Sequence, residues 1–207
     1  MNATQPTVCI VDDDDSVRRA LARMLGAHRY HTACFESARH FLDGVDLDSV
    51  PICAVIDLQM PDMDGIALQQ AMSRRVPVVI LTGHADVGKA VQAMQAGAID
   101  FLEKPVQDMT LLAAVERACE CAMDQFVRRA ELKVLRQKVE RLTPREREVL
   151  AWIVSGLRNK QVASELGTVE KTIKVHRAHV MQKLEVDSLP ALVRIADKMG
   201  MGLVARA

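Results

Sequence analysis

The chain of 207 residues has few aromatic side chains, which make up 3% of it although 49% of the chain is hydrophobic. Its cores must therefore be built mainly from Leu, Val, Ile, Ala and Met. No apolar run approaches the roughly 18 residues of a membrane span, and the N-terminus lacks the basic and then apolar stretch of a secretory signal. We therefore expect a cytoplasmic protein that does not associate with membranes, and the length suits two small domains.

The sequence also lacks paired Cys-x-x-Cys spacing. Its five cysteines are an odd number and all lie in the first part of the chain. These features argue against a disulfide framework or a zinc site. Cys9, Cys34 and Cys53 lie inside apolar strand-like runs, so we expect buried free thiols there.

Net charge is zero, but the two parts of the chain differ in sign. Residues 1–123 carry 17 acidic and 10 basic side chains, whereas residues 124–207 carry 10 acidic and 17 basic ones. This asymmetry predicts cation chemistry in the first part and a polyanionic partner for the second.

Five short apolar runs alternate with helical patterns in the first part. The runs, each typical of a buried strand, are Val8–Val11, His31–Phe35, Ile52–Ile56, Val78–Thr82 and Ile99–Leu102. Alternating βα units predict right-handed crossovers. The expected fold is a doubly wound, flavodoxin-like parallel sheet in the order 2-1-3-4-5, with helices on both faces.

Polar side chains stand where these runs end. The residues at the ends of the first, third, fourth and fifth runs are Asp12, Asp13, Asp57, Thr82 and Lys104. In the expected strand order they converge on one edge of the sheet. Taken singly, the acids could be a solvated helix N-terminus or turn formers. Three convergent carboxylates would repel one another without a cation, and oxygen-only ligands favour Mg²⁺.

This constellation resembles the receiver domain of two-component response regulators over about residues 6–123. The resemblance implies that Asp57 accepts a phosphoryl group from a histidine kinase. It implies that Asp13, Asp57 and the backbone carbonyl of Gln59 hold Mg²⁺ or Mn²⁺, with Asp12 acting directly or through water. Lys104 and Thr82 would bind phosphoryl oxygens.

The same resemblance assigns a switch. Phe101 matches the aromatic residue that packs inward when Thr82 moves toward the phosphate, although an ordinary core Phe is the alternative. Phosphorylation would then promote homodimerisation through Asp86–Glu103 and the fifth helix. Gln59 and His84 occupy positions that tune dephosphorylation, and Pro105 follows a cis peptide bond in the family.

Residues 124–141 contain no Gly or Pro, so the last helix of the first domain is expected to continue as a linker helix. A short apolar stripe is formed there by Leu132, Leu135, Val139 and Leu142. It could pack on the chain's own domain or form a two-helix seam. Its small number of heptads favours packing on the chain's own domain.

Residues 142–207 form the second expected domain. Thr143, Pro144 and Glu146 have the pattern of an N-cap, an N1 proline and a capping box. Asn159 is expected to cap a short helix, and Gly167 to make the turn before a longer helix from about Glu170 to Leu184. This pattern predicts an all-α helix-turn-helix domain.

The last helix has a basic outer face that suits a major groove, although a solvated helix face is the alternative. The stretch resembles the LuxR-type helix-turn-helix of the NarL/FixJ family in the pieces Leu142–Leu150, Asn159-Lys160 and Thr172–His176. Thr168 and Val169 depart from the family pattern, so Thr168 is the expected cap. The expected DNA contacts are Asn159, Lys160, Lys171, Thr172, Lys174, Val175, Arg177, Ala178 and Lys183.

Together these features indicate a FixJ-like response regulator rather than an enzyme. Its expected partners are a histidine kinase, double-stranded DNA with a two-fold-related site, RNA polymerase and a second copy of the chain. A phosphatase of the haloacid-dehalogenase kind is the first rival, but Gln59 stands where such enzymes need a second Asp. A phosphate-independent or redox switch is the second rival, which the expected burial of Cys9, Cys34 and Cys53 disfavours.

Overall fold

The computed structural model describes residues 5–84 and 86–200. They belong to two compact units, Met1–Arg128 and Arg129–Ala207, and each unit is described by itself. None of the helices in these ranges is long and apolar enough to cross a membrane.

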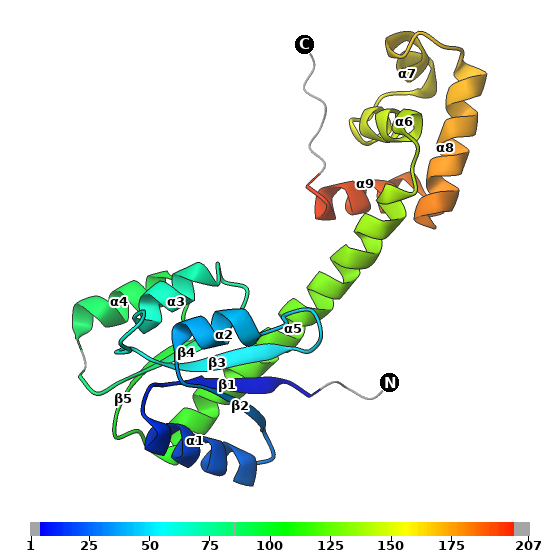
Figure 1. The fold of residues 1–207 in the computed structure, drawn as a ribbon. Helices are drawn as coiled ribbons and strands as arrows, with labels where there is room; N and C mark the ends of the chain where they lie inside the picture. The colour runs from blue at the N-terminus through cyan, green and yellow to red at the C-terminus, as the bar shows by residue number, and fades with distance from the viewer. Residues whose placement is uncertain (1–4, 85, 201–207) are drawn as a thin grey trace. The chain divides into compact units, whose positions relative to one another are not determined.

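The first unit is built on a five-stranded parallel sheet with the order β2-β1-β3-β4-β5 (Figure 1). This confirms the predicted fold class. The central strand β3 is buried along its whole length, as expected for a parallel sheet covered on both faces. The strands are β1 (Thr7–Val11), β2 (His31–Phe35), β3 (Ile52–Asp57), β4 (Val78–Thr82) and β5 (Asp100–Glu103).

Helices cover both faces of this sheet. Side chains from α1 and α5, such as Leu25 and Leu111, share one core cluster. Those from α2, α3 and α4, such as Phe41, Leu68 and Ala93, share the other. The helices are α1 (Asp15–Ala27), α2 (Ala38–Gly44), α3 (Gly65–Ala71), α4 (Val87–Gln95) and α5 (Asp108–Glu140).

The cysteine prediction was wrong at one position. Cys9 and Cys53 are buried, but Cys34 is exposed. The reason is that β2 is an edge strand, in which His31 and Cys34 are exposed and the other residues are only partly buried. Ala33 and Phe35 pack on the core, and Cys34 between them faces the other way.

The second unit begins at Arg129 within α5 and also contains the helices that follow α5. They are α6 (Pro144–Val154), α7 (Asn159–Glu165), α8 (Glu170–Leu184) and α9 (Leu189–Lys198). Their buried side chains, including Leu150, Ile173 and Leu192, form one core. Val139 of α5 packs against this core and Leu142 is part of it, so the end of the apolar stripe lies on this unit.

Two helix starts differ from expectation. The capping box of α6 is present: the Thr143 side chain accepts from Glu146 N–H, and the Glu146 side chain accepts from Thr143 N–H. Asn159, however, is the first residue of α7, and Arg158 precedes it as the cap, its N–H bonded to the side chain of Gln161. At α8 the cap position is Val169 rather than Thr168, and no side chain caps the helix.

Candidate functional site

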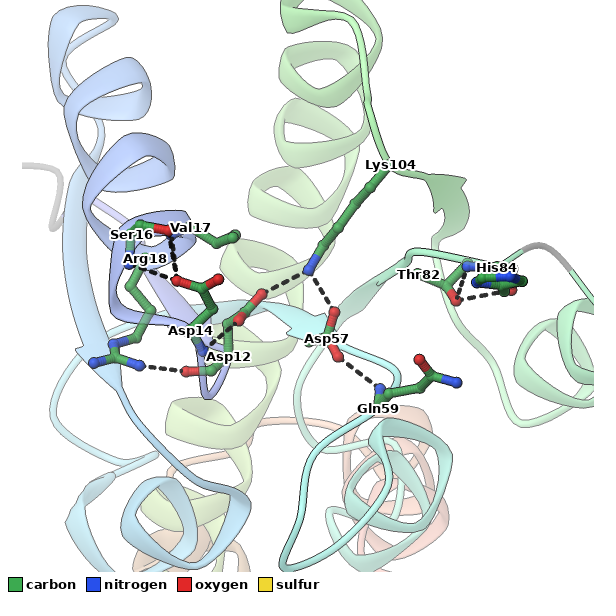
Figure 2. Close-up of polar contacts among 10 residues, drawn as sticks. All are labelled: Asp12, Asp14, Ser16, Val17, Arg18, Asp57, Gln59, Thr82, His84 and Lys104. Atoms are coloured by element: carbon green, nitrogen blue, oxygen red, sulfur yellow. Dashed lines mark hydrogen bonds and ion pairs between the residues drawn. The ribbon is translucent and has the colours of Figure 1, made fainter.

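An ammonium group joins two carboxylates at the carboxyl edge of the sheet. Asp12 follows β1, Asp57 ends β3 and Lys104 follows β5. The Lys104 Nζ donates to Asp12 Oδ2 at 2.8 Å and to Asp57 Oδ1 at 2.5 Å (Figure 2). The topology thus brings together three residues that are 45 and 47 positions apart in the chain.

Both carboxylates are buried, with Asp12 2% and Asp57 7% exposed. Their remaining oxygens accept backbone N–H groups: Asp12 Oδ1 from Asp14 at 2.9 Å, and Asp57 Oδ2 from Gln59 at 2.6 Å. Burial alone would lower the pKa of Lys104, but hydrogen bonds from its ammonium to the two carboxylates raise it instead. One ammonium against two carboxylates leaves the cluster with an excess negative charge.

Two residues that sequence reasoning did not assign hold the first loop in place. Arg18 donates to the backbone carbonyl of Asp12 at 2.7 Å, and its side chain also pairs with Asp15. Asp14 caps α1 by accepting from Ser16, and this hydrogen bonding lowers the pKa of Asp14. The i, i+3 spacing of Asp15 and Arg18 predicts their ion pair. The bond from Arg18 to the Asp12 carbonyl depends on the shape of the loop between β1 and α1, which the spacing does not predict.

Thr82 lies beside the cluster without bonding to it. Its side chain is fully buried. The hydroxyl donates to the carbonyl of His84 at 2.9 Å and accepts from the His84 N–H at 3.2 Å (Figure 2). Phe101 is half-buried and packs on the core cluster shared by α2, α3 and α4. The Lys104-Pro105 bond is cis, as the resemblance implied.

Gly65 permits the close approach of α3 to the end of β3. A Cβ at this position would lie 2.6 Å from the carbonyl oxygen of Asp57. Any larger residue at this position would therefore force the backbone of α3 or of Asp57 to shift.

The donors at this edge suit a hard cation in their chemistry. They are the carboxylate oxygens of Asp12 and Asp57, a kind of ligand that Mg²⁺ takes. Across residues 5–84 and 86–200, no three carboxylate, imidazole or thiol groups are already gathered as a metal cluster. Asp13 is exposed, and Lys104 provides the positive charge between Asp12 and Asp57.

The second candidate surface is the outer face of α8. Lys171, Lys174, Val175 and Ala178 are all exposed, whereas Ile173 and other members of the opposite face are buried. Lys174 pairs with Glu170 one turn earlier at 3.1 Å. This face presents cationic and small apolar groups together, as a major-groove reader requires.

Residues flanking this face differ in exposure. Lys160 is exposed, whereas Thr172 and Arg177 are half-buried. Arg177 also reaches Asn159 Oδ1 at 3.4 Å, which joins α8 to the start of α7.

Lys183 differs from the other expected DNA contacts. Its Nζ donates to Glu146 Oε2 at 2.7 Å, and Glu146 is only 3% exposed. The same oxygen accepts the Thr143 N–H at 2.8 Å, and His179 Nδ1 lies 3.7 Å from Oε1. Burial alone would raise the pKa of Glu146, but the hydrogen bonds from Lys183 and Thr143 lower it instead. Lys183 therefore joins α8 to the start of α6.

Two family models match this chain. Residues 8–116 match the response regulator receiver domain, and residues 140–196 match the bacterial regulatory proteins of the luxR family. The chain is 41% identical to the transcriptional regulatory protein FixJ of Rhizobium meliloti, covering 96% of this chain and 98% of that protein. It is 38% identical to nodulation protein W of Bradyrhizobium diazoefficiens, covering 96% of this chain and 88% of that protein.

Solved structures are similar as well. The response regulator StyR has a TM-score of 0.75 at 41% identity, covering 94% of this chain and 99% of that one. Full-length FixJ from B. japonicum has a TM-score of 0.54 at 38% identity, covering 96% and 98%.

Proposed function

This chain belongs to the two-component response regulators that join a receiver domain to a LuxR-type DNA-binding domain, and we propose that Asp57 is its phosphoacceptor. The observation that carries the proposal is the buried Asp57 carboxylate, which shares the Lys104 ammonium with Asp12 at the carboxyl edge of the sheet. Its family consists of transcriptional regulators, so the phosphoryl group is a signal rather than a substrate for turnover.

In the proposed reaction Asp57 Oδ1 attacks the phosphorus of a kinase phosphohistidine. The P–N bond breaks as the P–O bond forms, and the histidine leaves. Lys104, already bonded to Asp57 Oδ1, shifts to a phosphoryl oxygen and neutralises the charge that arrives. Asp13, Asp57 and the Gln59 carbonyl, with Asp12 directly or through water, would hold Mg²⁺ or Mn²⁺, which supplies further charge neutralisation.

The proposed switch begins at Thr82. Its hydroxyl would exchange its bond to the His84 carbonyl for one to a phosphoryl oxygen, and Phe101 would pack further inward. On α4, the side chains of Val87, Val91 and Met94 are exposed, which is unusual for large apolar groups. They support the proposal that Asp86–Glu103 becomes a dimer face on phosphorylation.

The proposed output is binding of double-stranded DNA at a two-fold-related site in the cytoplasm, with RNA polymerase as a further partner. Lys171, Lys174, Val175 and Ala178 would face the major groove. Asn159, Lys160, Thr172 and Arg177 would contact its edges or the phosphates. Lys183 is left out of this set because its ammonium is bonded to the buried Glu146.

Asp57→Asn tests the phosphoacceptor proposal. In Mg²⁺ and a small phosphodonor such as acetyl phosphate, we expect the wild-type chain to gain one phosphoryl group in intact-mass spectra and to dimerise. Asp57→Asn should do neither, because an amide oxygen is too weak a nucleophile.

The matched control is Asp62→Asn. Asp62 lies in the loop after β3 and its carboxylate accepts the Arg39 N–H at 3.0 Å. It should behave as wild type. Phosphorylation and dimerisation of Asp57→Asn to the wild-type extent would overturn the proposal.

A further inference from the structure

Two buried thiols that have no part in the proposed phosphotransfer touch each other in the first unit. The Sγ atoms of Cys53 on β3 and Cys119 on α5 lie 3.5 Å apart, within hydrogen-bonding distance for sulfur. Cys53 is fully buried, and Cys119 is 8% exposed. The two residues are 66 positions apart in the chain, so only the fold brings them together.

The two sulfurs are not equivalent. The hydrogen bond between the two sulfurs lowers the pKa of Cys119 and raises that of Cys53, which burial raises further. Burial also raises the pKa of nearby Cys9 to about 12, so that side chain stays a thiol. Cys119 is therefore the less deeply buried and the more easily ionised member of the pair, so it is the member that an oxidant would meet first.

We propose that Cys53 and Cys119 are a redox pair that closes to an intrachain disulfide when the protein meets a peroxide. The Cys119 thiolate attacks one peroxide oxygen, the O–O bond breaks, and the departing hydroxide takes a proton to become water. Cys119 is then a sulfenic acid. The Cys53 sulfur attacks the Cys119 sulfur, the S–O bond breaks, and the Cys53 proton leaves with the second hydroxide as water. The two thiols lose two electrons and the peroxide gains them.

Closure changes the first unit in two ways. A disulfide has an S–S length of about 2.05 Å, so the sulfurs approach by about 1.5 Å and β3 and α5 are drawn together. The bond also closes a long loop in the unfolded chain, which stabilises the folded unit. Cys53 lies on the same strand as Asp57, so the cross-link ties the phosphoacceptor strand to the helix that continues into the second unit.

The test treats the full chain with hydrogen peroxide, then alkylates the remaining thiols in denaturant. We expect two of the five thiols to become unreactive. Dithiothreitol should restore them, and non-reducing peptide mapping should find Cys53 linked to Cys119. The oxidised chain should also melt at a higher temperature than the reduced chain.

The matched controls are Cys34→Ala and Cys121→Ala, because Cys34 is exposed and Cys121 half-buried. Each should keep the Cys53–Cys119 link, whereas Cys53→Ala and Cys119→Ala should lose it. Peptide mapping of the wild-type chain decides the matter even where a core variant folds poorly. Full alkylation after peroxide, or links that join other cysteines only, would overturn the proposal.

Discussion

Asp57 in the first unit and Glu146 in the second are both buried carboxylates bonded to a lysine from a distant segment, yet their surroundings differ in charge balance. Asp57 shares Lys104 with Asp12, so two carboxylates depend on one ammonium. Glu146 has Lys183, the Thr143 N–H and the nearby His179 to itself. This difference in charge balance supports the proposal that Asp57 serves in chemistry and Glu146 in structure.

Glu146→Gln should therefore have a large effect on the stability of the second unit. The change removes the charge attraction between the buried carboxylate and Lys183, and we expect a loss of about 2 kcal/mol in the unfolding free energy. Thermal or urea unfolding of the full chain, followed by a probe of the second unit such as the Trp152 fluorescence, measures it. A change of less than about 0.3 kcal/mol in the unfolding free energy would contradict the structural role of Glu146.

Lys174→Met and Lys183→Met should separate a DNA contact from a structural lysine. Lys174→Met should lower the slope of log affinity against log salt by about 1, because one phosphate or base contact is lost. Lys183→Met should leave that slope unchanged while destabilising the second unit. Shift assays over a salt series on the same DNA provide the measurement, and equal slope changes in the two variants would contradict the distinction.

The pH dependence of stability should differ between the Glu146 ion pair of the second unit and the Lys104 cluster of the first. The pKa of Glu146 is lowered in the folded chain, so its contribution is present above the unfolded pKa of about 4.3 and is lost as the pH falls through the folded value. Lys104 has a raised pKa, so its contribution is present at neutral pH and is lost only as the pH rises through that value. Unfolding of the second unit should thus become easier below about pH 4, and Glu146→Gln should flatten that acid limb.

Asp57→Asn should have the smallest effect on stability, although we expect it to abolish phosphorylation. Removing one carboxylate relieves the excess negative charge, and Lys104 keeps its bond to Asp12. We expect the unfolding free energy of the first unit to change by less than about 0.5 kcal/mol, or to rise. A loss as large as that of Glu146→Gln would show that Asp57 is a structural acid as well.

The first unit could be predicted further than the second because its site depends on strand order. Once five alternating units imply a 2-1-3-4-5 sheet, the residues after each strand must share an edge, and Asp12, Asp57 and Lys104 do. The hydrogen bonds from Lys104 to both acids could not be predicted in this way, because the hydrophobic pattern of the sequence does not specify side-chain geometry.

Other features depend on contacts that no local pattern records. The Glu146–Lys183 bond joins residues 37 positions apart across two helices, so Lys183 looked like one more basic side chain on α8. Cys34 lies in an apolar run, but its exposure depends on β2 being an edge strand. Asn159 has the side chain of a typical N-cap, yet it is the first residue of α7, and Arg158 holds the cap position.

The hydroxyl of Thr82 has a consequence for the sensitivity of the receiver. It already makes two hydrogen bonds within its own loop, to the carbonyl and the N–H of His84. A phosphoryl oxygen can therefore only replace one of these bonds, and the number of bonds that Thr82 makes stays the same. In the proposed switch, only the difference in strength between the hydrogen bond lost and the one gained would drive the exchange, so we expect the resting and activated arrangements of the loop to be close in energy. We expect such a loop to respond to a single phosphoryl group and to return as readily when that group is lost.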